Sequence, residues 1–209
     1  MTDVLRRCMF DQPVQLRAAP EGSTSPGTLF GYALQFNKLS RDLGGYYEEI
    51  APEAVDLAST GRVMCRHEHR SSALLGTTDA GTLRLSKDDI GVLYEDDLPA
   101  TSAGKDVAIL AGRGDIAYSS FAFRVPPGGE RWYIDAEDRL IVRVLALSLV
   151  DVAPVADPAY WSSSSEVRSM QLDLDKIRAG IATPPPTDPP AGARLRAELA
   201  LAHAYGDRI

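Results

Sequence analysis

The stretch Asp115-Ile-Ala-Tyr-Ser-Ser-Phe-Ala-Phe-Arg124 is the one around which the fold of this chain is organised. Its aromatic residues alternate with smaller ones, as they do along a β-strand with one apolar face. On a strand, Phe121 and Phe123 share a face with Ser119, whereas Ser120 lies on the opposite face. The sequence therefore predicts a core strand that carries two adjacent hydroxyl groups on opposite sides.

The composition of the 209 residues is that of a soluble globular protein, with 44% hydrophobic and 24% charged residues. The formal net charge of −7 argues against a nucleic-acid-binding surface. The longest apolar run, 140–150, contains Arg143 and Ser148 and is too short to span a bilayer. We therefore expect neither nucleic acid nor a membrane as a partner. Two cysteines, Cys8 and Cys65, make no disulfide framework, and a reducing cytoplasm is the default setting.

Alternation and turn residues predict a mainly β fold with peripheral helices. In the strand over 28–36, the face that holds Phe30 and Tyr32 is the more apolar and is expected to point at the core. Apolar spacing over 105–113 predicts a helix that ends at glycines 112 and 114. The remaining expected strands are 14–17 (at an edge), 46–50, 82–85, 91–98, 116–125, 132–134 and 140–150. Prolines at 154 and 158 predict that a strand over 151–160 bends or lies at an edge.

The character of the chain changes after Trp161. A serine run at 162–165 leads into a segment over 165–178 that suits an exposed helix or an extended chain. The proline-rich segment 183–190 predicts a stiff polyproline spacer, and 193–205 a short helix. We therefore divide the chain into a folded domain, 1–161, and a Ser/Pro-rich tail with a short C-terminal helix, 162–209. Such a tail suits either a cleavable anchor or a disordered terminus.

Two of the three histidines stand in His67-Glu68-His69. On a strand both side chains point the same way, which suits a metal ligand pair as well as a general base. A zinc site needs at least a third ligand, and neither His203 nor either cysteine stands at a familiar ligand offset. The two histidines are also compatible with polar residues at a strand end, the interpretation that the pattern alone favours over a metal site.

A second hypothesis pairs a histidine with a serine and an orienting acid. A serine hydroxyl is a weak nucleophile near neutral pH and needs a neighbouring base to accept its proton. The base in turn is held in one tautomer by a third group. Asp151 directly follows the apolar run 140–150, so the order would be histidine, serine, aspartate. The residues permit such a triad but do not select it.

Four stretches follow one another along the chain. They are Tyr32–Asn37 with Tyr47–Ala54, His69–Gly76 followed by Gly81–Leu85, Ser120–Phe123 after Gly112–Asp115, and Leu149–Ala159. They resemble the opening strand, the "H-D-x-x-x-x-L-G" motif, the "M-S-F-G-F" motif and the "L-x-E-V-S-x-V-x-x-P-A" motif of the tailed-phage prohead maturation proteases. This family shares its fold with the herpesvirus capsid maturation protease, assemblin. The resemblance spans 30–160, about three-fifths of the chain. It implies an assemblin-like, largely antiparallel β-barrel that needs no cofactor.

By this resemblance Ser120 is the nucleophile, His69 the general base, and Asp151 the third member where the family usually has glutamate. Arg143 matches a recurrent arginine and is a candidate for supporting the oxyanion. Ser119 replaces the family's methionine and is a secondary candidate for the nucleophile. His67 is a secondary candidate for the base, and the register of the motifs favours Ser120 and His69.

The resemblance implies a serine endopeptidase that cleaves scaffold protein and major capsid protein segments during procapsid maturation. Such enzymes work inside the procapsid in the host cytoplasm, and many trim themselves; self-association is compatible with this role. The alternative is a capsid-assembly or scaffold-associated module whose active-site motif has drifted. Its motivation is the set of departures from the motifs at positions 70, 119 and 151.

Overall fold

The computed structural model describes residues 4–9, 13–156 and 173–182. The chain divides into two compact units, Met1–Leu172 and Asp173–Ile209. The second unit contains the helix α2 (Leu174–Ala182), which overlaps the end of the segment 165–178 expected to be helical or extended and continues four residues beyond it. The predicted domain boundary at 161, the polyproline spacer and the helix over 193–205 lie outside the described residues.

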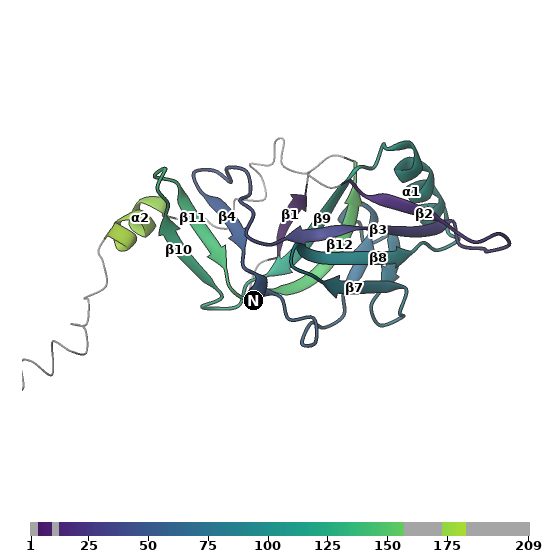
Figure 1. Cartoon of the computed structure of the whole chain (residues 1–209), viewed down its shortest axis with the longest axis horizontal. Coiled ribbons are helices and arrows are strands. Elements are labelled where there is room, and N and C mark those ends of the chain that lie inside the picture. Colours follow the sequence, from purple (N-terminus) through teal and green to yellow (C-terminus); the bar gives the residue numbers. More distant parts are fainter. Residues whose placement is uncertain (1–3, 10–12, 157–172, 183–209) are drawn as a thin grey trace, which may run out of the picture. The chain divides into compact units, whose positions relative to one another are not determined.

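The first unit is mainly β, as predicted, and its described strands make three sheets (Figure 1). The five-stranded sheet has the order β1 (Leu5–Met9), β9 (Tyr118–Arg124), β12 (Ser148–Val155), β5 (Met64–Arg66) and β6 (Leu74–Thr77). The four-stranded sheet has the order β2 (Gln15–Ala18), β3 (Gly27–Gln35), β8 (Gly91–Asp97) and β7 (Leu83–Lys87). The three-stranded sheet has the order β10 (Glu130–Ile134), β11 (Leu140–Val144) and β4 (Tyr47–Ile50).

The expected closed antiparallel barrel is not found among these strands. The sheets remain separate, and two strand pairs, β12 with β5 and β11 with β4, are parallel. The main core lies where β3 packs against β9 and β6 against β8, so the five- and four-stranded sheets share one hydrophobic cluster. The nucleophile-candidate strand β9 therefore has its phenylalanines buried between two sheets, with Phe121 and Phe123 at 1% and 0% exposure.

The apolar run 140–150 was predicted to be one strand, and this prediction is wrong. β11 ends at Val144 and β12 begins at Ser148, and the two strands belong to different sheets. The backbone N–H groups of residues 145 and 146 donate to the carbonyl of Gly129, and that of residue 147 donates to the carbonyl of Ala54. These bonds turn the chain from one sheet into the other, which an unbroken aliphatic pattern does not reveal.

The predicted buried face of the strand over 28–36 is also wrong over most of its length. Leu29, Gly31 and Ala33 are buried, whereas Phe30 and Tyr32 are partly exposed. Arg17 lies over the Phe30 ring at 5.0 Å, and the Tyr32 hydroxyl donates to Asp88. Polar neighbours thus cover the aromatic face, and the small residues let β3 approach the core closely. A bulge in the pairing of β3 with β8 follows at 32–34.

The helix α1 (Ser102–Arg113) confirms the predicted helix and its end. The Thr101 side chain accepts a hydrogen bond from the Gly104 N–H, so the helix begins one turn earlier than expected. Gly114 ends it with a φ of 84°, in the left-handed region where glycine is favoured. Two single 3₁₀ turns complete the fold, η1 (Pro52–Ala54) and η2 (His67–His69).

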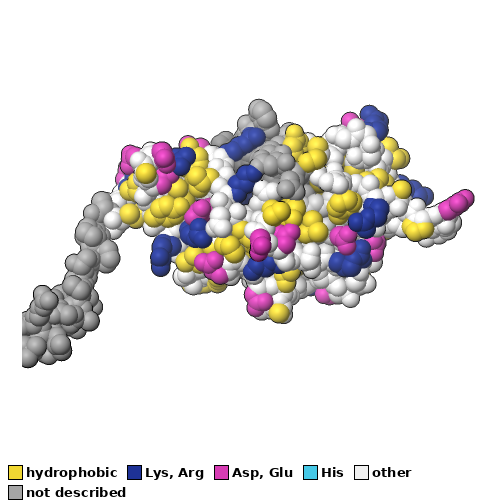
Figure 2. All heavy atoms as spheres, in the orientation of Figure 1, with side chains coloured by type: hydrophobic (Ala, Val, Ile, Leu, Met, Phe, Trp, Pro, Cys, Tyr) yellow, Lys and Arg dark blue, Asp and Glu magenta, His cyan; other side chains and the backbone are white. Residues whose placement is uncertain are grey.

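On the face shown in Figure 2, basic and acidic side chains of the described residues are intermixed, with apolar side chains between them. Neither α1 nor α2 has the length and apolarity of a membrane-spanning helix.

The close pairing of β3 with β8 yields a stability prediction. A Cβ at Gly91 would lie 2.0 Å from the Leu34 carbonyl oxygen, and this backbone atom cannot move away without a cost in free energy. We expect Gly91→Ala to lower the free energy of unfolding by about 1–3 kcal/mol. Gly112→Ala is the control, because Gly112 is exposed in α1 and a Cβ there meets nothing closer than 3.8 Å. It should raise stability by about 0.5 kcal/mol. Urea unfolding measures both changes, and equal stability of wild type and Gly91→Ala would contradict the packing.

Candidate active site

Ser120 lies in the middle of β9, flanked on both sides by paired strands. Its Cα partners are Cys8 in β1 and Ala153 in β12. The residue is 1% exposed. On the other face of β9, the rings of Phe121 and Phe123 stack with centroids 5.2 Å apart. Paired strands and the aromatic packing therefore hold the Ser120 backbone in a fixed position.

His69 reaches Ser120 from the turn η2 and not from a strand, which corrects the prediction for His67 and His69. β5 ends at Arg66, and Glu68 and His69 have φ values of 55° and 54°. These left-handed conformations are uncommon for residues other than glycine. The Glu68 side chain accepts a hydrogen bond from the Ala156 N–H at 2.8 Å, which ties the turn to the end of β12. The strained turn is thus held by its neighbours.

Asp151 lies in β12 between β9 and β5, opposite Ala122 and Met64. It is 2% exposed and directly follows a bulge in the pairing with β9. Along β12, β5 pairs only with Asp151 and Val152, so among the described residues no strand pairs with β12 on that side at Pro154. Pro154 therefore occupies an edge position, as predicted, although β12 lies between two strands at Asp151 and Val152.

The structure brings Ser120, His69 and Asp151 together. Ser120 Oγ lies 2.6 Å from His69 Nε2, and His69 Nδ1 lies 2.5 Å from Asp151 Oδ1. An ionised carboxylate only accepts hydrogen bonds, so Nδ1 carries the proton and Nε2 is free to accept one from the serine. The arrangement can take a proton from Ser120 and stabilise the resulting imidazolium.

Arg66 is a site residue that the sequence patterns did not single out. Its Nη1 donates to Asp151 Oδ2 at 3.3 Å, so the second carboxylate oxygen also has a partner. The guanidinium is 22% exposed and the carboxylate 3%. The available signal was its position, three residues before His69 at the end of β5, where it points to the same edge of the sheet as the turn. Arg66 fixes the orientation of Asp151.

Ser119 faces away from this site, as the alternation along the strand predicts. Its Oγ lies 3.1 Å from the hydroxyl of Tyr94, which is fully buried in β8. Burial raises the pKa of Tyr94, so this phenol stays protonated. Among the described residues, no histidine forms a hydrogen bond with the Ser119 hydroxyl, whose side-chain partner is Tyr94.

Asp96 and Cys65 are buried near Tyr94, behind the triad. Asp96 is 0% exposed. Its carboxyl group interacts with the Cys65 thiol, but neither carboxylate oxygen forms a hydrogen bond of standard geometry with a described residue. Burial raises the pKa of Asp96 to about 7 and, with the charge of Asp96, also raises the pKa of Cys65. Cys65 is therefore a protonated, buried thiol.

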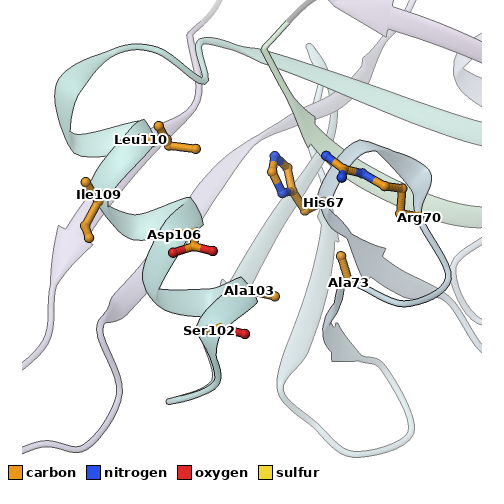
Figure 3. A pocket seen from close by; sticks show the side chains of 8 residues that line it. All are labelled: His67, Arg70, Ala73, Ser102, Ala103, Asp106, Ile109 and Leu110. Atoms are coloured by element: carbon orange, nitrogen blue, oxygen red, sulfur yellow. The ribbon is translucent and has the colours of Figure 1, made fainter.

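His67 lies apart from the triad, in the wall of a pocket between η2 and α1 (Figure 3). The pocket has a volume of about 500 Å³ and is lined by His67, Arg70, Ala73, Ser102, Ala103, Asp106, Ile109 and Leu110. Burial lowers the pKa of His67, which favours the neutral ring. The positive φ values at residues 68 and 69 separate the two histidines, so they do not form a ligand pair. Among the described residues, no group of three His, Cys, Asp or Glu could hold a metal ion.

Arg143 is not brought to the triad. It lies in β11 of the three-stranded sheet, where its guanidinium donates to Glu49 at 2.7 Å and to Asn37 at 3.0 Å. The Glu49 contact raises the pKa of Arg143 further. The hydrogen bonds of this arginine join β11 to β4 and the end of β3.

A serine, a histidine and an aspartate in this order of contacts have the arrangement of a serine hydrolase triad. The sequence model of the caudovirus prohead serine proteases matches residues 13–176. The chain belongs to this family, and it is accordingly a serine peptidase of the capsid maturation class. No curated protein and no solved structure gave a significant match.

The buried carboxyl of Asp96 makes stability depend on pH. Because its pKa in the folded chain is about 7, against a usual 3.8, its contribution to stability is full below pH 3.8 and is lost as the pH rises to about 7. We expect wild type to lose stability relative to Asp96→Asn over this range, by at most about 1.4 kcal/mol per pH unit. Urea unfolding at a series of pH values measures the difference.

Asp97→Asn is the matched control for this prediction. Asp97 is the next residue in β8, but Arg84 and Thr28 bind it and lower its pKa. Its contribution is present above pH 3.8 and lost as the pH falls, the opposite sense. Identical pH profiles for the two variants would contradict the burial of Asp96.

Proposed function

We propose that Ser120 is the nucleophile, His69 the general base and Asp151 the orienting acid of a viral capsid maturation endopeptidase. The single observation that carries the proposal is the unbroken chain of contacts from Ser120 Oγ through both nitrogens of His69 to Asp151 Oδ1, at 2.6 and 2.5 Å. The aspartate reaches the imidazole despite its short side chain, because β12 runs beside the end of β5 from which η2 departs.

The chemistry follows from these contacts. Ser120 Oγ attacks the carbonyl carbon of a peptide bond while its proton passes to His69 Nε2. Asp151 stabilises the imidazolium through Nδ1. His69 then gives its Nε2 proton to the departing amine nitrogen, which leaves an acyl group on Ser120. A water molecule, deprotonated by His69, hydrolyses that ester and restores the serine.

Family membership supports the choice of substrates. A prohead protease acts on the proteins of its own assembly, so we propose scaffold protein and the major capsid protein as substrates, together with segments of this chain. The site of action is then the interior of the procapsid in the host cytoplasm. If the protein is instead a capsid-assembly module without catalytic activity, no substrate will be cleaved in assembled shells.

Substitution of the two serines tests the assignment. Ser120→Ala should lower the rate of substrate cleavage by about 10⁴-fold or more, because the acyl-enzyme cannot form. Ser119→Ala should retain cleavage, because Ser119 contacts Tyr94 and not His69. Mass spectrometry of capsid and scaffold proteins co-expressed with each variant measures the products.

The pattern of loss separates the hypotheses. Loss of cleavage only in Ser119→Ala would move the nucleophile to that residue. Complete absence of products with the wild-type protein in assembled shells would favour the non-catalytic module. Far-ultraviolet circular dichroism controls for folding in both variants.

A further inference from the structure

The pocket between η2 and α1 shares a wall with the candidate triad. Its volume is about 500 Å³, within the range of small ligand sites, and Ser102, Asp106 and Arg70 in its lining are exposed. His67 and Arg70 stand two positions before and one position after His69. The Cα atoms of residues two positions apart are at most about 7 Å from each other. The pocket therefore lies next to the turn that carries His69, and none of its lining residues takes part in the proposed proton transfer.

Arg70 brings an unpaired positive charge to this pocket. Among the described residues, no carboxylate forms an ion pair or hydrogen bond with its guanidinium, whereas Arg62 and Arg66 each bind an aspartate. A guanidinium has five N–H donors in a planar fork that matches the two oxygens of a carboxylate. The turn is held by backbone bonds, since the Arg70 N–H donates to the His67 carbonyl and the Ala73 N–H donates to the Arg70 carbonyl. The Arg70 side chain is thus available to bind a ligand.

His67 supplies a second donor to the same space. Its side chain and that of Arg70 extend from the turn toward α1 (Figure 3). Burial lowers the pKa of His67 and the charge of Arg70 lowers it further, whereas the charges of Glu68 and Asp106 raise it. The neutral imidazole has one N–H to donate, and a carboxylate bound beside it favours the protonated ring. His67 is thus a stronger partner once an anion has entered the pocket.

The lining favours a negatively charged ligand over a positively charged one. Asp106 is the one carboxylate among the lining residues, so a cation finds a single charged partner. An anion finds the Arg70 guanidinium and the His67 ring, and the first turn of α1, which begins at Ser102, presents the positive end of the helix dipole. Ile109 is 60% exposed at the pocket, where it can contact the methylene groups of a bound side chain. The expected occupant is an acidic side chain with an apolar stem.

We propose that the pocket between η2 and α1 is a specificity subsite for an acidic side chain of the peptide substrate, glutamate or aspartate, and that Arg70 determines this preference. The inference rests on the proposed function of Ser120, because a subsite requires a peptide held at that serine. An extended peptide advances about 3.3 Å per residue, so four residues span about 13 Å. The selected acid therefore lies within about four residues of the scissile bond.

Cleavage-site mapping tests the preference in the assembled particle. Mass spectrometry of the new termini in co-expressed capsid and scaffold proteins identifies each scissile bond. We expect a glutamate or aspartate at one constant position within about four residues of every bond. Replacement of that residue by glutamine should slow cleavage by the wild-type protein at least about tenfold, because a hydrogen bond between charged groups is lost.

Charge reversal at Arg70 tests the residue itself. Arg70→Glu should slow cleavage of the natural substrates at least about tenfold, and it should regain cleavage of a substrate in which lysine replaces the selected acid. Arg62→Glu is the matched control, because Arg62 is also an exposed arginine but does not line the pocket. It should cleave the natural substrates at the wild-type rate. Far-ultraviolet circular dichroism checks the fold of both variants.

A binding measurement separates the pocket from catalysis. The full-length Ser120→Ala variant is titrated with N-acetylglutamate amide while NMR follows the imidazole signals of His67, which His67→Gln assigns. We expect these signals to shift and the pKa of His67 to rise, because the bound carboxylate favours the protonated ring. N-acetylglutamine amide and N-acetyllysine amide should leave the signals unchanged, and Arg70→Gln should abolish the response to the acidic probe.

The results distinguish failure of the inference from failure of the proposed function. Cleavage sites without a shared acid, or equal cleavage by wild type and Arg70→Glu, would overturn the inference and leave the role of Ser120 intact. A response of His67 to the lysine probe alone, or to none of the probes, would overturn it as well. Absence of any cleavage by the wild-type protein in assembled shells would reject the proposed function, and the subsite with it.

Discussion

The position of β12 between β9 and β5 is the constraint on which the site depends. It pairs with the serine strand on one side and, for two residues, with the strand that leads into the histidine turn on the other. Ser120 and His69 are 51 residues apart in the chain, and His69 and Asp151 are 82 apart. Here a shared sheet brings groups so distant within hydrogen-bond reach, and its backbone ladder leaves the strands few degrees of freedom.

The two faces of β9 have different surroundings. One face carries the phenylalanines and Ser119 against β3 and β8, where Tyr94, Cys65 and Asp96 make a buried polar group. The other carries Ser120 toward the histidine. The polar group is costly, because burial disfavours the ionised form of the Asp96 carboxyl and raises its pKa to about 7. It lies on the side of β9 opposite Ser120, where the Tyr94 hydroxyl contacts Ser119.

A hydrolase with a nearly inaccessible nucleophile has to expose it before each use. Ser120 Oγ donates a hydrogen bond to the carbonyl oxygen of Arg7 in β1, the edge strand of the five-stranded sheet among the described residues.

Local patterns in the sequence were enough for the mainly β class, the end of α1 at Gly114 and the opposite faces of Ser119 and Ser120, because these follow from periodicity and turn chemistry. The order of the motifs selected Ser120, His69 and Asp151, which alternation alone had not. The tertiary structure decided which face of β3 is buried, where the run 140–150 changes sheets, that His69 stands on a left-handed turn, and that Arg66 and the Arg7 carbonyl reach the site. Each of these depends on a partner far away in the chain. A pattern of near neighbours records how a segment alternates, but not which strand will lie beside it.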